Sequence, residues 1–298
     1  MRRIFALGFF DGVHVGHQAL LKACCALARE HRCVPSVVSF ANHPDTLVLG
    51  RTPALINTGE DRLRLLNWFG IRSVETLAFD QKMMTMPWQD FVTMLLRDYR
   101  AQGIVCGNDF CIGYRGEGTP EKLKAACEEA GIPCRVVPEQ TVHGTRVSST
   151  HIRSLIREGS MEEAVAFLGH PHLLTGTVVH GKQLGRTLGI PTANLQLPGG
   201  LVIPRFGVYA CMARVQDYWY PAVTNVGTRP TVNGVGVTVE PWILGYQGDL
   251  YGREISLEFY KFLRPERKFP DLTALQQEIF RNAEQTREFA RQLNRNEL

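Results

Sequence analysis

Along the first half of the chain, short apolar runs alternate with segments in which apolar residues recur at helical spacing. Ile4–Phe10 and Pro35–Phe40 read as buried strands, and His17–Glu30 between them has the spacing of a helix. The same alternation predicts further helices over Asp61–Phe69, Trp88–Arg100 and Pro120–Ala130 and further strands over Ser73–Phe79, Ile104–Cys106 and Arg135–Val137. It predicts a parallel sheet covered by helices, with ligands beyond the carboxyl ends of the strands.

The pattern changes after Gly169, where the helical period largely disappears. Short β-rich runs are separated by Gly, Pro and Asn turns, which predicts an antiparallel barrel or sandwich. The runs are Gly176–Val179, Gly207–Val215, Tyr220–Asn225, Val235–Leu244 and Glu254–Phe262. Helical spacing returns over Leu272–Leu293, and a short helix over Met161–Leu168 connects the two halves. The expected fold class is α/β plus all-β, with one domain over residues 1–169 and another over 170–298.

Composition places the 298-residue chain among ordinary globular proteins, with 44% hydrophobic and 21% charged residues. The net charge of +4 suits phosphate-bearing ligands but is well short of a dedicated nucleic-acid binder. No apolar stretch approaches the roughly 18 residues that span a bilayer, so we expect no membrane partner. The start of the chain reads as a first strand rather than a signal peptide, because Asp11 interrupts its apolar run. We expect a cytoplasmic protein.

The cysteines are interpreted as small buried hydrophobes in a reducing compartment. The chain is long enough to build its core without disulfides, and no CxxC pair offers zinc-ligand spacing. They are Cys24, Cys25, Cys33, Cys106, Cys111, Cys127, Cys134 and Cys211.

The strongest local signal is the sequence GFFDGVHVGH over residues 8–17, between the first predicted strand and the first predicted helix. The N–H groups at a helix N-terminus form an anion site, and Gly12 and Gly16 let the backbone approach a ligand. His14 and His17 are three residues apart, so both imidazoles can face one pocket. Two donors there suit the charge that develops during nucleotidyl transfer. A pair of satisfied turn histidines is the alternative interpretation.

This sequence resembles the HxGH signature of the α/β-phosphodiester nucleotidyltransferases, and the fuller string GxFDGxHxGH resembles their FAD synthetase branch. The resemblance implies a Rossmann-like domain in which the phosphate of FMN attacks the α-phosphorus of ATP and pyrophosphate leaves. It implies catalytic roles for His14 and His17. The implied ATP-binding residues are Gly8, Phe9, Asp11, Gly12, Gly16, Arg146, Ser149 and Thr150.

Two further blocks extend the resemblance. RVSSTHIR over residues 146–153 is similar to a (K/R)xSSTxIR motif, and Ser149 and Thr150 are expected to cap a helix over Ile152–Glu158. GNDFCIG over residues 107–113 resembles a flavin-contacting GxDFxFG segment. That block implies flavin contacts from Asn108, Asp109 and Phe110. Taken without the motif, Phe110 is more simply interpreted as a residue of the hydrophobic core.

In the second half, GTVVHG at residue 176 and GRTLGIPTAN at residue 185 closely resemble the riboflavin kinase fingerprint. The resemblance implies a riboflavin-kinase β-barrel with a terminal helix, in which Glu240 takes the proton of the ribityl hydroxyl as it attacks the γ-phosphorus of ATP. An exposed strand residue is the alternative for Glu240. The implied ATP- and flavin-binding residues are Gly181, Gly185, Arg186, Gly189, Pro191, Asn225 and Arg264.

Thr192 and Asn194 are the expected metal ligands. A hydroxyl and an amide oxygen at spacing two would face one side of a strand, and Mg²⁺ prefers such oxygen ligands together with phosphates. Apart from the binding role that the resemblance implies for Arg264, we interpret the charged cluster as a solvated face of the protein. It consists of Arg264, Glu266, Arg267 and Lys268.

The resemblance covers nearly the whole chain and implies a bifunctional enzyme that converts riboflavin to FMN and FMN to FAD with ATP and Mg²⁺. Its departures leave two alternatives open. Residues Phe40–Pro44 resemble an FxPHP motif but have Ala41 and then Asn42 in place of the first proline, and Ile112 stands where an aromatic residue is usual; these departures would favour a kinase alone. Gly245 stands where riboflavin kinases usually have a carboxylate, which would favour an adenylyltransferase alone. A non-catalytic flavin-binding module is the alternative from another class. The expected partners are small-molecule substrates and no nucleic acid, with a homo-oligomer left open.

Overall fold

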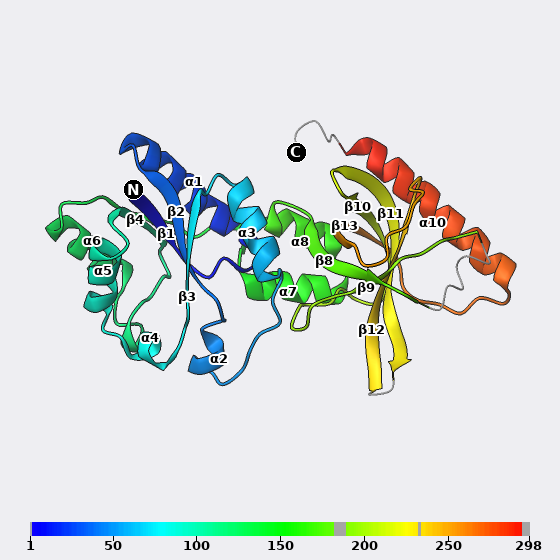
Figure 1. The fold of residues 1–298 in the computed structure, drawn as a ribbon, viewed down its shortest axis with the longest axis horizontal. Helices are drawn as coiled ribbons and strands as arrows, with labels where there is room; N and C mark the ends of the chain where they lie inside the picture. The colour runs from blue at the N-terminus through cyan, green and yellow to red at the C-terminus, as the bar shows by residue number, and fades with distance from the viewer. Residues whose placement is uncertain (1, 182–188, 232–233, 294–298) are drawn as a thin grey trace. The chain divides into compact units, whose positions relative to one another are not determined.

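The computed structural model describes residues 2–181, 189–231 and 234–293 (Figure 1). It divides into two compact units, Met1–Ser149 and Thr150–Leu298. The domain boundary expected after residue 169 stays a prediction. Helices α7 (Ser149–Glu158) and α8 (Met161–Leu168) lie, apart from Ser149, in the second unit.

The first unit contains the expected parallel sheet, in the strand order β3-β2-β1-β4-β5. Its strands are β1 (Arg3–Leu7), β2 (Val34–Phe40), β3 (Ser73–Leu77), β4 (Ala101–Gly107) and β5 (Cys134–Val137), followed by the two-stranded β6 (Thr141–Val142) and β7 (Thr145–Arg146). The helices are α1 (Val15–Glu30), α2 (Asp45–Val48), α3 (Gly59–Trp68), α4 (Gln81–Thr85), α5 (Trp88–Arg97) and α6 (Pro120–Glu129), with short 3-10 turns η1 (Asp11–Val13) and η2 (Tyr114–Gly116).

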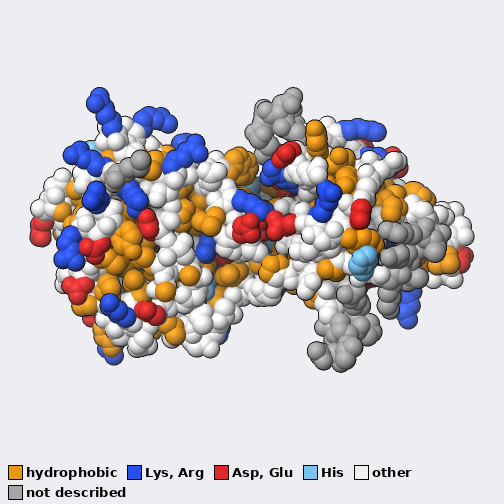
Figure 2. All heavy atoms as spheres, viewed as in Figure 1, with side chains coloured by type: hydrophobic (Ala, Val, Ile, Leu, Met, Phe, Trp, Pro, Cys, Tyr) orange, Lys and Arg blue, Asp and Glu red, His pale blue; other side chains and the backbone are white. Residues whose placement is uncertain are grey.

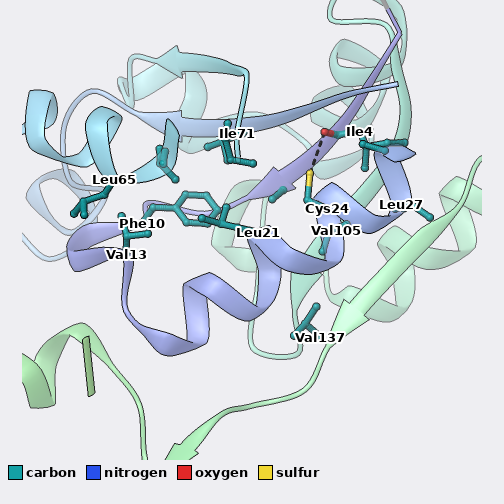
Figure 3. Packing of buried hydrophobic residues seen from close by; sticks show 14 residues of the cluster. Ile4, Phe10, Val13, Leu21, Cys24, Leu27, Leu65, Ile71, Val105 and Val137 are labelled. Atoms are coloured by element: carbon teal, nitrogen blue, oxygen red, sulfur yellow. Dashed lines mark hydrogen bonds between the residues drawn. The ribbon is translucent and has the colours of Figure 1, made fainter. Parts of the chain in front are cut away.

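Helices cover both faces of this sheet because its strands are apolar on both sides. In β1, Ile4 belongs to the hydrophobic cluster under α1 and α3, and Phe5 belongs to the cluster under α5 and α6. Figure 3 shows the first of these clusters, in which Cys24 of α1 lies beside Ile4 and Leu21 of α1 lies beside Phe10. The Cys24 thiol also donates to the Ile4 carbonyl oxygen at 3.3 Å. This packing fixes α1, and with it the loop that precedes α1.

The second unit is a closed barrel in the order β10-β11-β12-β9-β8-β13, which confirms the predicted all-β half. Its strands are β8 (His172–Val179), β9 (Asn194–Gln196), β10 (Gly207–Val215), β11 (Tyr218–Thr231), β12 (Gly234–Ile243) and β13 (Glu254–Arg264). Helix α10 (Leu272–Gln292) packs against β10 and β11, and α8 packs against β8 and β13. The Asp271 carboxylate caps α10 by accepting the Ala274 N–H at 2.7 Å.

The burial predicted for the cysteines is correct for only part of the set. Cys24, Cys106, Cys127 and Cys211 are buried, but Cys25, Cys33 and Cys134 are half-buried and Cys111 is exposed. Cys111 follows Phe110 on the loop beyond the end of β4. All eight are free thiols.

Charged residues of both signs are interspersed with apolar ones on the face of the first unit seen in Figure 2, in keeping with the small net charge of +4. Within the described ranges, no helix is both long enough and apolar enough to cross a membrane.

Candidate functional site

The loop between β1 and α1 is a left-handed turn at the carboxyl edge of the sheet. Phe10 has φ 62° and Gly12 has φ 81°. A side chain at Gly12 would therefore be strained. The strand predicted to run to Phe10 ends at Leu7, because the chain must leave the sheet to form this turn. Gly16, at the start of α1, allows the His14 ring to approach, since a Cβ there would lie 3.2 Å from the imidazole.

This turn brings the two predicted catalytic histidines together. The rings of His14 and His17 stack with centroids 3.6 Å apart and planes 12° apart. His14 caps α1, and its Nδ1 accepts the His17 N–H at 3.2 Å, so a neutral His14 carries its ring proton on Nε2. Burial lowers the pKa of His17 well below 6.5, helped by the nearby His14 and Arg62. The Nδ1 atom of His17 is buried and has no hydrogen-bond partner among the described residues.

Asp11 ties the histidine turn to its surroundings. Its buried carboxylate accepts the N–H groups of Ile56 and Asn57 at 2.9 and 3.4 Å, directly before α3. Its carbonyl oxygen accepts the Ser149 hydroxyl at 2.9 Å, which joins the first motif to the second. The expectation that Ser149 and Thr150 cap a helix starting at Ile152 is wrong: α7 already begins at Ser149, whose hydroxyl is used by Asp11.

Arg62 is a site residue that the sequence pattern did not reveal. This buried arginine of α3 donates to the carbonyl oxygens of Phe9 at 3.2 Å and Phe40 at 3.1 Å, which follow β1 and end β2. Its guanidinium also lies 4.4 Å from the centroid of the Phe9 ring. Burial lowers the pKa of Arg62 and the charge of Asp11 opposes that shift. A helical arginine usually points to solvent, so only the packing of α3 shows this role.

A largely apolar cavity of about 680 Å³ lies beside the histidine turn in the first unit, and we call it the flavin cavity after the ligand that the sequence resemblance implies for this unit. Three residues predicted from the motifs line it: Gly8, Phe9 and Phe110. The other predicted flavin residues, Asn108 and Asp109, do not line it. Ile112, from the GNDFCIG segment, also lines it, but most of the remaining wall was not predicted from the sequence, including Phe40, Leu47, Val48, Phe79, Met83, Met84, Met86 and Tyr114. The methionines of the QKMMTM segment were the available signal.

Two predicted residues from different motifs form an ion pair near the end of β4. Arg146 Nη2 lies 2.6 Å from Asp109 Oδ2, and Arg146 Nε lies 3.1 Å from Glu139 Oε2. Arg146 and Asp109 are both more than half exposed. Exposed ion pairs stabilise a protein little, so this guanidinium can exchange its partners for a phosphate at small cost.

A second cavity of about 340 Å³, here called the barrel cavity, lies in the second unit. Glu240 and Asn225 face each other across β11 and β12 and both line it, together with Thr192 and Arg264. Four predicted kinase residues thus meet in one place. The apolar wall was missed by the sequence analysis and comes from several elements: Ile190, Val208, Val223, Trp242, Phe269, Leu275 and Ile279.

The interpretation of the charged cluster as a solvated face is wrong for Arg264. Its side chain is only 14% exposed, and its Nε donates to Asn282 of α10 at 2.9 Å. Glu278 lies 3.6 Å from Arg264 and 2.9 Å from Arg267, so one carboxylate holds both cations at the cavity. Burial lowers the pKa of Arg264, although Glu278 opposes this shift. Because α10 packs on the barrel, it buries a residue that a surface strand would expose.

The expectation that Thr192 and Asn194 share one face of a strand is also wrong. Strand β9 begins at Asn194, which pairs with Val179 at the end of β8. Thr192 therefore precedes the strand and does not share one of its faces with Asn194. Thr192 lines the barrel cavity, whereas Asn194 lines a different hollow and packs on Gly181, where a Cβ would lie 2.2 Å from the Asn194 Nδ2.

The remaining predicted kinase residues are placed only in part. Pro191 lines a further hollow beside Tyr246 and Tyr251. Gly189 has φ 68°, and no atom of the described residues lies within 4 Å of the place where its Cβ would be. Gly185 and Arg186 lie outside the described residues.

Comparisons with known proteins match both units. A model of the FAD synthetase family matches residues 1–151, and a model of the riboflavin kinase family matches residues 168–290. Proteins described as bifunctional riboflavin kinase/FMN adenylyltransferase include one from Listeria monocytogenes, 32% identical over 97% of this chain and 93% of the relative. Another, from Escherichia coli strain K12, is 34% identical over 96% of this chain and 92% of the relative.

A solved structure described as a macrolide-efflux protein from Streptococcus pneumoniae is also similar, with a TM-score of 0.88 and 30% identity. It covers 96% of this chain and 94% of its own.

Two units of unlike fold, each with its own cavity and its own polar motif, define a two-domain transferase. The chain belongs to the bifunctional riboflavin kinase/FMN adenylyltransferase family. It phosphorylates riboflavin to FMN and adenylylates FMN to FAD, with ATP as the donor in both reactions.

Proposed function

We propose that the first unit forms FAD at the histidine turn, with the isoalloxazine ring of FMN in the flavin cavity. The cavity is lined mainly by aromatic and aliphatic side chains, and Gly8 and Phe9 connect it to the turn. The phosphates of ATP lie against the N-terminus of α1, where backbone N–H groups and the His14 Nε2 donate to them. His17 is neutral at physiological pH, so it acts through a hydrogen bond rather than a charge. FMN phosphate is already an anion and needs no general base.

The second unit phosphorylates riboflavin in the barrel cavity. Glu240 accepts the proton of the ribityl hydroxyl, because a neutral alcohol is a poor nucleophile. Asn225, directly across from Glu240, orients the hydroxyl or the carboxylate by hydrogen bonding. Trp242, Ile279 and the other apolar residues cover the flavin ring, and Arg264 supplies positive charge beside it.

Mg²⁺ is the proposed metal of the kinase reaction, where it neutralises phosphate charge. The Thr192 hydroxyl and the Asn194 amide oxygen fit it by donor type, since Mg²⁺ takes few protein oxygens and completes its coordination with phosphates and water. We propose that this Mg²⁺ enters the site bound to ATP. Among the described residues, no group of three or more His, Cys, Asp or Glu side chains forms a metal site of its own. We further propose that the enzyme acts in the cytoplasm on small molecules alone.

The observation that carries this assignment is that each unit contains its own apolar cavity beside its own motif. The test is product chromatography with ATP and either riboflavin or FMN. Val48 is 56% exposed at the flavin cavity, and V48E should suppress FAD formation while riboflavin phosphorylation continues. Phe269 lines the barrel cavity, and F269A should have the opposite effect. Equal loss of both reactions in either folded variant would contradict the assignment.

A further inference from the structure

The side chain of Asn42 clasps the backbone of Phe79 through both the nitrogen and the oxygen of its amide group. Its Nδ2 donates to the Phe79 carbonyl oxygen at 2.8 Å, and its Oδ1 accepts the Phe79 N–H at 3.0 Å. Strand pairing between β2 and β3 ends at Phe40 and Leu77, followed by one bond from the Ala41 N–H to the Leu77 carbonyl at 2.9 Å. Beyond the end of the sheet, the Asn42 side chain therefore makes the two hydrogen bonds to Phe79 that a paired strand backbone would make.

This clasp fixes one wall of the flavin cavity. Phe79 packs edge-on against Phe40, with ring centroids 5.1 Å apart, and both line the cavity. The next residue, Asp80, caps α4 by accepting the Met83 N–H at 2.8 Å. The start of α4 is thus set by the position of Phe79, and α4 and the residue after it supply Met83, Met84 and Met86 to the cavity.

We propose that Asn42 is a positioning residue for FMN in the adenylyltransferase reaction. The proposal rests on the assignment of FMN to the flavin cavity. Without the clasp, the Phe79 backbone exchanges its two bonds for water, and Phe79 and α4 no longer keep one position against the flavin ring. The effect is specific for flavin, because the histidine turn has its own anchors in Asp11 and Arg62.

The experiment compares the full-length enzyme with two variants, N42A and N42L, in steady-state FAD formation with FMN and ATP varied separately. Each variant loses both hydrogen bonds, and we expect KM for FMN to rise about tenfold. KM for ATP, kcat and riboflavin phosphorylation should stay within about twofold. The matched control is N67A, which removes an exposed asparagine of α3 whose side chain accepts a surface bond from Arg72. It should leave KM for FMN unchanged.

The proposal is overturned if both N42 variants keep KM for FMN within twofold of wild type, or if KM for FMN, KM for ATP and kcat change together. V48E separates this failure from a failure of the cavity assignment. If V48E raises KM for FMN and the N42 variants do not, FMN binds in the flavin cavity and Asn42 has no part in it. If V48E leaves KM for FMN unchanged, the cavity assignment itself is wrong.

Discussion

The imidazole rings of His14 and His17 lie face to face, with centroids 3.6 Å apart, at the entrance to α1. Stacking at this distance disfavours two positive charges, and burial already keeps the pKa of His17 well below 6.5. The pair therefore offers donor nitrogens at the N-terminus of a helix without a fixed double charge. We propose that this arrangement binds an anionic nucleotide through preorganised hydrogen bonds.

Replacing His17 with alanine should reduce FAD formation from FMN by at least about 100-fold, because one preorganised donor is lost where charge develops. Riboflavin phosphorylation should stay within twofold, since the barrel cavity belongs to the other unit. Both rates can be followed by flavin chromatography. H31A is the matched control: His31 is exposed at the other end of α1, and its loss should affect neither reaction.

Replacing Glu240 with glutamine should lower kcat for riboflavin phosphorylation by about 100- to 10,000-fold, the range for loss of a general base. The amide keeps the size of the side chain but cannot accept the proton. FMN adenylylation should be unaffected. The control is E254Q, at the exposed start of β13. A kcat for E240Q that matches wild type would remove Glu240 from the mechanism.

Replacing Gly181 with alanine should weaken the kinase through Asn194. The new Cβ would stand 2.2 Å from Asn194 Nδ2, so the amide must move away from its present position. We expect the Mg²⁺ concentration for half-maximal phosphorylation to rise several-fold. G199A is the control, because Gly199 has open space around its Cα and no positive φ. An unchanged Mg²⁺ requirement in G181A would argue against Asn194 as a metal ligand.

His172 should make folding sensitive to acid. Both ring nitrogens are buried without a hydrogen-bond partner among the described residues, and burial lowers the pKa of His172 to about 3. Between pH 3 and pH 6.5 the unfolded chain binds a proton that the folded chain excludes, so stability falls as the pH falls below 6.5. We expect H172L to remove roughly 2 kcal/mol of the stability difference between pH 7 and pH 5.

Urea unfolding at the two pH values measures this effect. The change in midpoint from pH 7 to pH 5 should be smaller in H172L than in wild type, whereas H31L should behave as wild type does. An equal pH response in wild type and H172L would show that His172 takes up a proton between pH 7 and pH 5 as readily in the folded protein as in the unfolded chain.

The sequence predicts the fold well because hydrophobic periodicity reflects burial. β10 was predicted with the bounds that the structure has, since Gly207–Val215 is apolar and lies between turns. The proximity of the His14 and His17 imidazoles was also predicted, because residues three apart at the start of a helix place their side chains close together. Contacts between distant segments were not predictable: Arg62 reaching two strand ends, Asn282 orienting Arg264, and Asn42 holding Phe79. Each of these depends on packing that local spacing does not encode.

The central claim is that the two reactions are carried out by separate sites in separate units, and a mixture of two variants tests it most directly. H17A should convert riboflavin to FMN and stop, and E240Q should convert added FMN to FAD but leave riboflavin unchanged. Mixed with riboflavin and ATP, the two should produce FAD, because FMN made by H17A serves as substrate for E240Q. A mixture that forms no FAD, while both folded variants remain soluble, would contradict the account.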